Sequence, residues 1–359
     1  MANSPARVLI VRLGAMGDIL HALPAVALLR ATLPEIKIGW VVERRWHELL
    51  CAPGAELRGE RSVLRPLVDE VHLADTRQWR RNLLARETRA ELLSLRRGMK
   101  AAHYQAALDL QGSVKSAVVA RMAGTPGITG FRYPREAVAT IFYQMSAPTQ
   151  SAHVIRQNVE LVRYWLRGIP CQTVSTFASG SAPLPRHAES EARMAEVLHT
   201  HGIEGPFAIL NPGAGWRAKQ WPAARYGELA RRLETLGLRS VINYGPGEVA
   251  MMQEAMAVSA GAAVPIQSSI SELIALTRKA RLFVGGDTGP THLAALLGIK
   301  TLALFGPTDP ARNGPFWQDS LVLREEDSVT DYSHSRHLDY GLQAMSVEHV
   351  LEAAQTLLA

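Results

Sequence analysis

The sequence FVGGDTGPTHLAALLG, from Phe283 to Gly298, joins a short β-branched and aromatic run to an apolar helical pattern through a glycine turn. Asp287 or Thr288 can cap the predicted helix, and Pro290 suits its first turn. Free N–H groups at such a helix start, together with the positive end of the helix dipole, favour an anion above the turn. The stretch therefore predicts a strand, a turn and a helix start that suits a diphosphate.

Polar side chains are crowded at the start of this helix. Thr288, Thr291 and His292 lie within one helical turn, which is more polar groups than packing needs. A Gly-Gly-Asp turn taken alone is more often an ordinary connection in an α/β protein. The added donors favour a binding site here, although a histidine on a partly buried helix is equally typical of packing.

The pattern of strand, turn and helix recurs along the chain. We expect strands at residues 7–13, 37–42, 68–73, 104–110, 129–132, 207–210, 240–244, 282–284 and 301–305. Strands that alternate with helices in this way predict doubly wound parallel sheets. In two such halves, the glycine-bearing turns at the strand ends would line one crevice. We therefore predict an α/β protein of two Rossmann-like domains that face a central cleft.

Length and composition suggest where these domains divide. A chain of 359 residues favours two domains over a single core. After residue 170 the chain becomes rich in Ser, Thr, Ala and Pro without clear periodicity. We expect an N-terminal domain over residues 1–170, a linker over 171–186 and a C-terminal domain over 187–345. The last helix, within residues 346–359, is apolar enough to pack back on the N-terminal domain.

The bulk composition is that of a soluble globular protein, with 47% apolar and 20% charged residues. No run approaches the ~18 to 20 apolar residues that cross a bilayer, and the N-terminus lacks the layout of a signal peptide. Cys51 and Cys171 lie far apart in sequence, which argues against a disulfide framework. We expect a cytoplasmic protein.

The first predicted strand, residues 7–13, runs into the turn Gly14-Ala15-Met16-Gly17-Asp18. This turn lacks the GxGxxG spacing of a dinucleotide fingerprint. Asp18 stands at the start of the next helix, where an acidic residue can act simply as a cap.

Positive charge is concentrated between Arg77 and Lys100, where only Glu87 and Glu91 oppose a run of arginines. Such a block favours an acidic partner. Sites for RNA interleave aromatic and basic residues on strands, and Trp79 is the only aromatic residue in this block. We therefore expect no nucleic acid partner.

Several motifs, taken together and in order, resemble the heptosyltransferases of glycosyltransferase family 9 over nearly the whole chain. These motifs are RLGAMGDILHALP (12–24), KQWP (219–222), GPGE (245–248), GGDTGPTHLAALLG (285–298) and FGPTDP (305–310). MGDILHALPA, WVVE (40–43) and LDLQGSVKSA (108–117) are most similar to the ADP-heptose:lipopolysaccharide heptosyltransferase I type. The resemblance implies a GT-B architecture, no metal requirement, and inverting transfer of heptose from ADP-heptose to Kdo of the lipopolysaccharide inner core.

Inverting transfer is one in-line displacement at the anomeric carbon. It needs a base on the acceptor side, worth roughly 10² to 10⁴-fold, and stabilisation of the departing diphosphate on the other. Asp18 is similar to the catalytic Asp of the family and is the expected base. Lys219, followed by Trp221 and Pro222 as in the family, is the expected cation for the leaving group, although a lysine of this kind is also typical of a solvated surface.

The resemblance also implies a donor site. Glu248 looks like the glutamate that binds the nucleoside, Asp287 is expected to accept bonds from heptose hydroxyls, and the helix start contacts phosphate. The glycine turn at the beginning of the chain leaves room for substrate. The predicted donor-binding residues are Gly14, Ala15, Gly17, Lys219, Glu248, Asp287, Thr288, Gly289 and His292. The chain has no Asp-x-Asp and no His/Cys cluster at ligand spacing, so we expect no metal and no cofactor.

Kdo carboxylates and lipid A phosphates are acidic, and they account for the basic block. Arginine suits them because its planar fork grips a carboxylate or phosphate through two bonds. The predicted acceptor-binding residues are Arg77, Arg80, Arg81 and Arg135. The same patch is expected to hold the protein peripherally at the anionic inner face of the inner membrane. For the rest of the block, a solvated helix face is the preferred interpretation.

Two alternatives remain open from the sequence. One is heptosyltransferase II or another family 9 transferase with a different donor or acceptor. The other, from a different class, is a non-catalytic nucleotide-binding protein. Loss of transfer on removal of Asp18 separates the enzyme from the binding protein.

Overall fold

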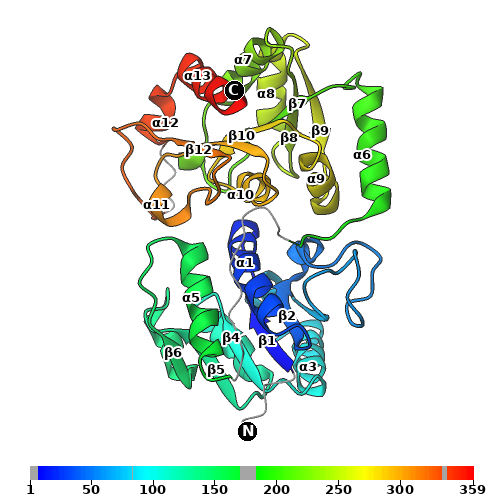
Figure 1. The fold of residues 1–359 in the computed structure, drawn as a ribbon, viewed down its shortest axis with the longest axis vertical. Helices are drawn as coiled ribbons and strands as arrows, with labels where there is room; N and C mark the ends of the chain where they lie inside the picture. Colours follow the sequence, from blue (N-terminus) through cyan, green and yellow to red (C-terminus); the bar gives the residue numbers. More distant parts are fainter. Residues whose placement is uncertain (1–6, 83, 170–182, 334–337) are drawn as a thin grey trace. The chain divides into compact units, whose positions relative to one another are not determined.

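The computed structural model describes residues 7–82, 84–169, 183–333 and 338–359. Within them the chain divides into two compact units, the first ending at Arg186 and the second beginning at His187 (Figure 1). Residues 171–182 of the predicted linker lie outside the described residues. Residues 183–186 belong to the first unit, where the Arg186 N–H donates a 2.8 Å hydrogen bond to the Val63 carbonyl.

The described part of the first unit holds a six-stranded sheet in the order β3-β2-β1-β4-β5-β6, with every neighbouring pair parallel. Its strands are β1 (Arg7–Val11), β2 (Lys37–Glu43), β3 (Glu70–Ala74), β4 (Ala106–Asp109), β5 (Gly127–Phe131) and β6 (Met145–Ala147). Its helices are α1 (Met16–Thr32), η1 (Arg44–Leu49), α2 (Thr76–Arg81), α3 (Arg86–Ala101), α4 (Val114–Met122), η2 (Ala137–Phe142) and α5 (Val154–Leu166). Helices α1 and α5 pack on each other, while α3 and α4 share a core with residues of β1 and β4.

The second unit repeats this plan. Among its described residues the strand order is β12-β11-β10-β7-β8-β9, again parallel throughout. Its strands are β7 (Phe207–Asn211), β8 (Arg239–Tyr244), β9 (Ala263–Gln267), β10 (Leu282–Gly286), β11 (Lys300–Leu304) and β12 (Ser320–Leu323). Its helices are α6 (Ala188–Thr200), η3 (Arg217–Lys219), α7 (Ala223–Glu234), α8 (Val249–Ser259), α9 (Ile270–Thr277), α10 (Gly289–Leu296), α11 (Pro310–Asn313), α12 (Tyr340–Ala344) and α13 (Val347–Leu358).

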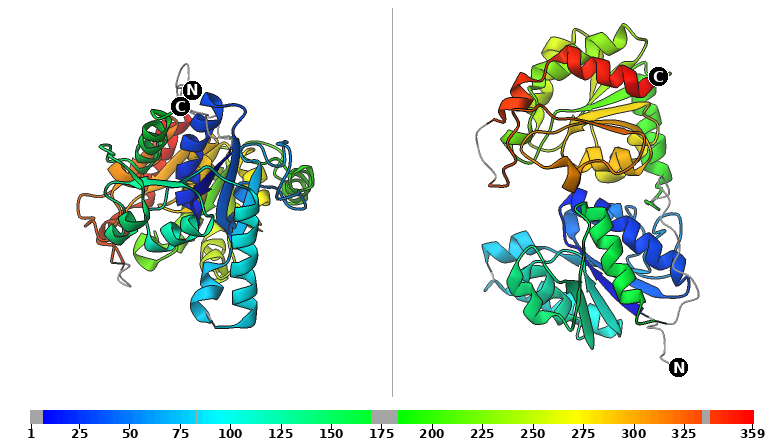
Figure 2. Two further views of the ribbon diagram at one scale, coloured as in Figure 1. Left: turned by 90° about the horizontal axis from the view of Figure 1, so that it is seen from below. Right: turned by 60° about the vertical axis from the view of Figure 1, so that its left-hand side comes forward.

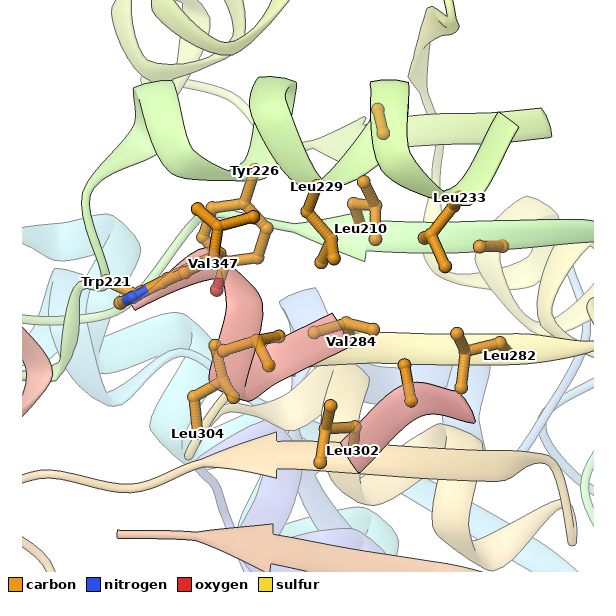
Figure 3. Packing of buried hydrophobic residues seen from close by; sticks show 14 of the residues in the cluster. Leu210, Trp221, Tyr226, Leu229, Leu233, Leu282, Val284, Leu302, Leu304 and Val347 are labelled. Atoms are coloured by element: carbon orange, nitrogen blue, oxygen red, sulfur yellow. The ribbon is translucent and has the colours of Figure 1, made fainter. Parts of the chain in front are cut away.

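The side chains of β7 and β10 show why these sequences form central strands. Leu210 and Val284 point into the core beneath α7 (Figure 3). Ile209 and Phe283 belong to the core on the opposite face, with residues of α6 and α9. Because alternate residues of a strand face opposite sides, a strand buried on both faces is apolar along its whole length. The predicted doubly wound sheets are therefore confirmed in both units.

Each sheet has the strand order in which the first and fourth strands of the unit lie side by side. In the first unit these are β1 and β4, and in the second they are β7 and β10. The connections on either side of such a pair run in opposite directions, which leaves a crevice at the carboxyl ends of the strands. The residues that follow these strands are therefore the first candidates for a site in each unit.

The C-terminal helix, α13, lies in the second unit. Its apolar face, which includes Val347, Val350 and Ala354, is buried in the core of the second unit. There α13 packs on α7, β11 and β12 (Figures 1 and 2). This apolar face of α13 therefore packs within its own unit.

Candidate functional site

In the second unit, the crevice at the carboxyl ends of β7 and β10 brings Lys219 and Asp287 together. Lys219 ends η3 in the loop after β7, and Asp287 follows β10 directly. Lys219 Nζ lies 2.5 Å from Asp287 Oδ2 and also donates to the Asp287 carbonyl at 3.3 Å. Their side chains are only 15% and 5% exposed, so this is a largely buried ion pair. It stands where an α/β sheet places its ligand.

A glycine allows this approach. A Cβ at Gly286 would lie 2.8 Å from the Lys219 carbonyl oxygen, closer than real side chains come to backbone. The Gly-Gly pair at the end of β10 therefore lets the Lys219 loop lie against the strand. Trp216 completes the setting, because Lys219 Nζ lies 5.1 Å from the centre of its ring, within the range of a cation–π contact.

His292 holds the other oxygen of Asp287. His292 Nε2 lies 2.9 Å from Asp287 Oδ1, and the histidine is buried on α10. Burial of Asp287 opposes ionisation, but the hydrogen bond from His292 and the neighbouring positive charges overcome it and hold the pKa of the carboxyl far below its usual range. Asp287 is therefore ionised at neutral pH and pairs with both Lys219 and His292.

Helix α10 starts beside this cluster. Thr288 is its N-cap and Gly289 its first residue. Thr291 donates to the Gly286 carbonyl at 2.5 Å, and its hydroxyl lies 3.5 Å from that of Thr288. N–H groups in the first turn have no acceptor within the helix, so a helix start next to Lys219 suits an anion. Thr288 and Gly289 occupy the predicted positions on this turn.

Glu248, the predicted nucleoside ligand, lies over two glycine turns. It is the N-cap residue of α8, and its Oε2 accepts a 2.6 Å hydrogen bond from the Gly245 N–H. A Cβ at Gly213, in the loop after β7, would lie 2.1 Å from Glu248 Oε1. The carboxylate thus occupies the space that a side chain at Gly213 would take. The GPGE turn and the loop after β7 together fix the position of Glu248.

In the first unit, Asp18 lies in the first turn of α1, which follows β1 at the corresponding crevice. Its Oδ2 accepts a 2.9 Å hydrogen bond from the Ala15 N–H, and its Oδ1 lies 2.7 Å from Arg12 Nη2. Arg12 also donates to the Leu110 carbonyl at the end of β4. The Asp18 side chain is 42% exposed, so it is oriented by the protein yet reaches solvent. Asp18 does cap the helix, as the simpler interpretation expected. Because its side chain is partly exposed, the carboxylate is also accessible to a ligand.

The small residues of this turn, Gly14, Ala15 and Gly17, lie in different surroundings. A Cβ at Gly14 would lie 3.0 Å from Trp46 Nε1, so the residue is small because the indole packs on it. Gly17 lies in the first turn of α1, next to Asp18. Ala15 is exposed at the N-cap. Arg12 and the Gln111 side chain, which accepts a 2.8 Å bond from the Leu13 N–H, link this turn to the loop after β4.

A basic cavity of about 470 Å³ lies at the carboxyl ends of β2 and β3. Its charged lining consists of Glu43, Arg44, Arg45, Asp75, Arg77 and Arg81. Two of the predicted acceptor residues, Arg77 and Arg81, are therefore brought together here by α2. Arg80 is exposed and does not line the cavity, and Arg135 is exposed in the loop after β5.

Comparison with known proteins decides the family. A family model described as glycosyltransferase family 9 (heptosyltransferase) matches residues 92–336. The chain belongs to glycosyltransferase family 9. It is an enzyme that transfers a sugar, and the family resemblance predicted from its motifs is confirmed.

Curated relatives extend the family 9 match to most of the chain. Lipopolysaccharide heptosyltransferase 1 of Pseudomonas aeruginosa is 29% identical over 323 residues, which cover 88% of this chain and 83% of that protein. The protein of the same name from Escherichia coli K12 is 28% identical over 323 residues, covering 89% and 93%.

Solved structures of family 9 proteins share the fold. The E. coli heptosyltransferase WaaC with ADP matches with a TM-score of 0.77 at 24% identity, covering 98% of this chain and 99% of that one. A family 9 glycosyltransferase from Veillonella parvula DSM 2008 matches with a TM-score of 0.80 at 20% identity, covering 98% and 97%. The predicted GT-B fold, with its two Rossmann-like units, is confirmed.

The part of the chain that the structure describes has neither a cluster of metal ligands nor a membrane-spanning helix. No three His, Cys, Asp or Glu side chains there come together as ligands for a metal ion. No helix among those residues has both the length and the apolar character to cross a membrane.

Several charged residues beside the predicted site residues were not assigned a role from the sequence. Arg12, Glu43, Arg45 and Lys115 all lie within or beside motifs that carried the family resemblance, yet none was assigned a role. The available signal was position, because Glu43 ends the buried run of β2 and Arg45 follows it closely. Charged residues at the carboxyl end of a central parallel strand are candidates for ligand contacts.

Proposed function

We propose that this chain is an inverting heptosyltransferase of the type I class, which moves heptose from ADP-heptose to Kdo of the lipopolysaccharide inner core. The observation that carries the proposal is Asp287, buried between Lys219 and His292 at the start of α10. This arrangement presents a fixed ammonium group and a helix start to a diphosphate. Fixed charges of this kind usually contribute more to catalysis than any other single effect.

The donor binds to the second unit in this proposal. Glu248 accepts hydrogen bonds from the ribose, Asp287 from heptose hydroxyls, and Lys219 and the first turn of α10 contact the diphosphate. As the bond from the anomeric carbon to the phosphate oxygen breaks, the developing negative charge on ADP meets the Lys219 ammonium. The positive charge is in place before reaction, because Asp287 holds the lysine in position.

The acceptor binds to the first unit, where Asp18 is the proposed base. As the acceptor oxygen bonds to the anomeric carbon from the face opposite the phosphate, its proton passes to the Asp18 carboxylate. Each carboxylate oxygen has two lone pairs, so the bonds from Ala15 and Arg12 leave capacity for the acceptor hydroxyl. Gly14, Ala15 and Gly17, in the turn beside this carboxylate, are small and let the donor approach it. The domain assignment follows: residues 1–170 serve the acceptor and residues 187–345 the donor.

Arginines account for acceptor choice. Arg77 and Arg81 line the basic cavity. Arg80 is exposed on the same helix, α2, and Arg135 is exposed in the loop after β5. Kdo carboxylates and lipid A phosphates fit such a surface. The same basic residues would hold the enzyme at the inner face of the inner membrane, at ~1 kcal/mol for each one close to the lipid. The protein then works in the cytoplasm, peripherally on that surface.

Named relatives support the donor and the type I class. Lipopolysaccharide heptosyltransferase 1 is the name of the two relatives described above. The solved E. coli WaaC structures contain ADP in one case and ADP-2-deoxy-2-fluoro heptose in another. Heptosyltransferase II is the second candidate, because its E. coli structure matches with a TM-score of 0.74 at 20% identity.

The test is transfer itself. The purified protein, incubated with ADP-heptose and Kdo₂-lipid A, should add one heptose, detected by mass spectrometry. Asp18→Ala should bind ADP as the parent does, yet lose at least ~10²-fold in product formation. Asp339→Asn, which weakens the cap of α12 in the second unit, is the matched control and should leave transfer intact. If Asp18→Ala keeps the turnover of the parent, Asp18 is not the base. Heptose added only to an acceptor that already carries a heptose would favour type II.

A further inference from the structure

Glu43 is a buried carboxylate at the edge of the basic cavity. It is the last residue of β2, and its side chain is 8% exposed. Residues from three other elements meet it there. Thr76, the first residue of α2, donates to Oε1; Lys115 Nζ from α4 lies 3.5 Å from the same oxygen; and Arg45 of η1 donates to Oε2 at 2.9 Å. Both oxygens of the carboxylate are therefore in use.

These contacts form one connected group. Lys115 Nζ also donates to the Thr76 hydroxyl at 2.9 Å, so lysine, threonine and glutamate form a closed set. Burial opposes ionisation of Glu43, but the bond from Thr76 and the charges of Arg45 and Lys115 outweigh it and lower the pKa of the carboxyl. Glu43 thus remains charged and attracts two cations at the same time.

The position of α2 depends on the same group. Helix α2 has only six residues, too few to be stable alone, and it carries Arg77 and Arg81 four residues apart on one side. Asp75 caps it through the Gln78 N–H at 3.1 Å, and Trp79 is buried in the core. The bond from Thr76 to Glu43 fixes the start of this helix to the sheet.

The cavity carries more positive charge than the protein neutralises. Arg44, Arg45, Arg77 and Arg81 line it against the carboxylates of Glu43 and Asp75. Glu43 forms ion pairs with Arg45 and Lys115, and Asp75 caps α2. Arg44 pairs with Glu91 at 3.2 Å, so Arg77 and Arg81 are the lining arginines that favour an anionic guest.

We propose that Glu43 is a positioning residue for acceptor specificity, which holds Arg45, Lys115 and the start of α2 so that the cavity presents a fixed array of cations to the carboxylate of an acidic sugar. The inference rests on the proposed function for the identity of that sugar. A carboxylate and a phosphate share the chemistry that guanidinium groups recognise. Free Kdo and inorganic phosphate therefore serve as separate probes.

The test uses Glu43→Gln, which keeps the size of the side chain and an acceptor for Thr76 but removes the charge. The Michaelis constant for Kdo₂-lipid A should rise by about tenfold or more, because charge-assisted bonds are lost. The catalytic constant should change much less, and ADP affinity should be unchanged. Glu43→Asp keeps the charge and should restore part of the acceptor affinity.

Glu70→Gln is the matched control. Glu70 is also 8% exposed and pairs with Arg7 at 3.3 Å, but it lies at the start of β3, outside the cavity lining. Its loss should lower the melting temperature without changing the acceptor Michaelis constant. Equal changes in that constant for both variants, or an unchanged constant in Glu43→Gln, would overturn the positioning role.

Binding of free Kdo, followed by calorimetry, separates this inference from the proposed function. If the wild type binds Kdo, Glu43→Gln binds it at least about tenfold more weakly, and no heptose is transferred, the positioning role stands and the proposed function fails. If the wild type binds inorganic phosphate but not Kdo, the carboxylate assignment is wrong. If it binds neither probe, the cavity is no anion site and the inference falls.

Discussion

Lys219 Nζ lies 2.5 Å from Asp287 Oδ2, although the two residues are 68 positions apart in the sequence. The ammonium group that best suits a diphosphate is therefore fixed by a carboxylate of the same unit before any ligand arrives. Such preorganisation avoids a cost at the moment of reaction, since the charge need not be moved into place. Removal of either partner should impair donor chemistry and, because the other charge is left buried, also lower stability.

Lys219→Met tests this relationship. The variant keeps the aliphatic stem beside Trp216 but loses the charge, so transfer should fall by roughly 10² to 10³-fold and ADP should bind more weakly. Steady-state kinetics and calorimetry with ADP measure the two effects. Lys279→Met, which removes an exposed lysine after α9 in the same unit, should change neither. A Lys219→Met enzyme with normal turnover would exclude the lysine from leaving-group stabilisation.

The contact between Lys219 and Asp287 also shows what the sequence could and could not predict. Each residue was predicted from its own motif, but their contact requires β7 to lie beside β10, and strand order is not encoded in either motif. Apolar central strands such as β7 and β10 were predicted because both faces are buried. The unpredicted strands β6, β9 and β12 are all at a sheet edge, where short length, Pro265 or partial exposure weakens the pattern.

The failure to assign a role to Glu43 and Lys115 has a similar cause. Glu43 and Lys115 stand in separate motifs, and their ion pair forms only when β2 and α4 bring them together. The family resemblance gave Arg77 and Arg81 from local sequence, since α2 carries both. Long-range pairing, in contrast, has no local signal in a single sequence.

Gly213→Ala should behave like loss of Glu248. An alanine Cβ would lie 2.1 Å from Glu248 Oε1, so the carboxylate must move away from its place beside the Gly245 N–H. We expect ADP affinity to fall by about tenfold in Gly213→Ala and in Glu248→Ala, with little further loss in the double variant. Calorimetry with ADP gives all three values.

Gly215→Ala is the control for that series, because it lies in the same loop and a Cβ there meets no atom within 4 Å. It should bind ADP normally. Fully additive losses in the double variant would mean that Gly213 and Glu248 act on ADP through separate contacts.

Arg12→Met should reduce the catalytic constant while sparing ADP affinity. Arg12 Nη2 lies 2.7 Å from Asp18 Oδ1, and without this bond the proposed base loses its orientation. A misplacement of about 1 Å can cost ~10²-fold in rate, so we expect a loss of that order. Stopped assays with saturating acceptor measure the catalytic constant.

Arg30→Met provides the matched comparison for Arg12. Arg30 is 11% exposed, close to the 12% of Arg12, and pairs with Asp69 near the other end of α1. Its loss should lower the melting temperature and leave the catalytic constant unchanged. If the two variants lost activity in parallel with stability, the effect of Arg12 would be structural.

His72 makes the stability of the first unit depend on pH. The residue is buried in β3, its Nε2 lies 2.7 Å from the Tyr104 hydroxyl, and Glu70 Oε1 lies 3.7 Å away. Burial, followed by the charges of Arg58 and Arg7, lowers the pKa of His72 to about 4. The folded protein therefore holds this imidazole neutral over a range in which an unfolded chain protonates it.

The sign of the effect follows from proton uptake. An unfolded histidine takes up its proton near pH ~6.5, whereas folded His72 does so only near its lowered pKa, so the unfolded state binds more protons in between. The free energy of unfolding should fall as pH drops from about 6.5 to about 4, with His72 contributing up to about 3 kcal/mol of the loss. His72→Gln keeps a polar group beside Tyr104 but cannot titrate, so its urea-denaturation free energy should depend less steeply on pH than that of the wild type. His199→Gln, which removes a histidine that is 78% exposed, should follow the wild-type curve, and a His72→Gln curve parallel to both would show that His72 is not the group responsible.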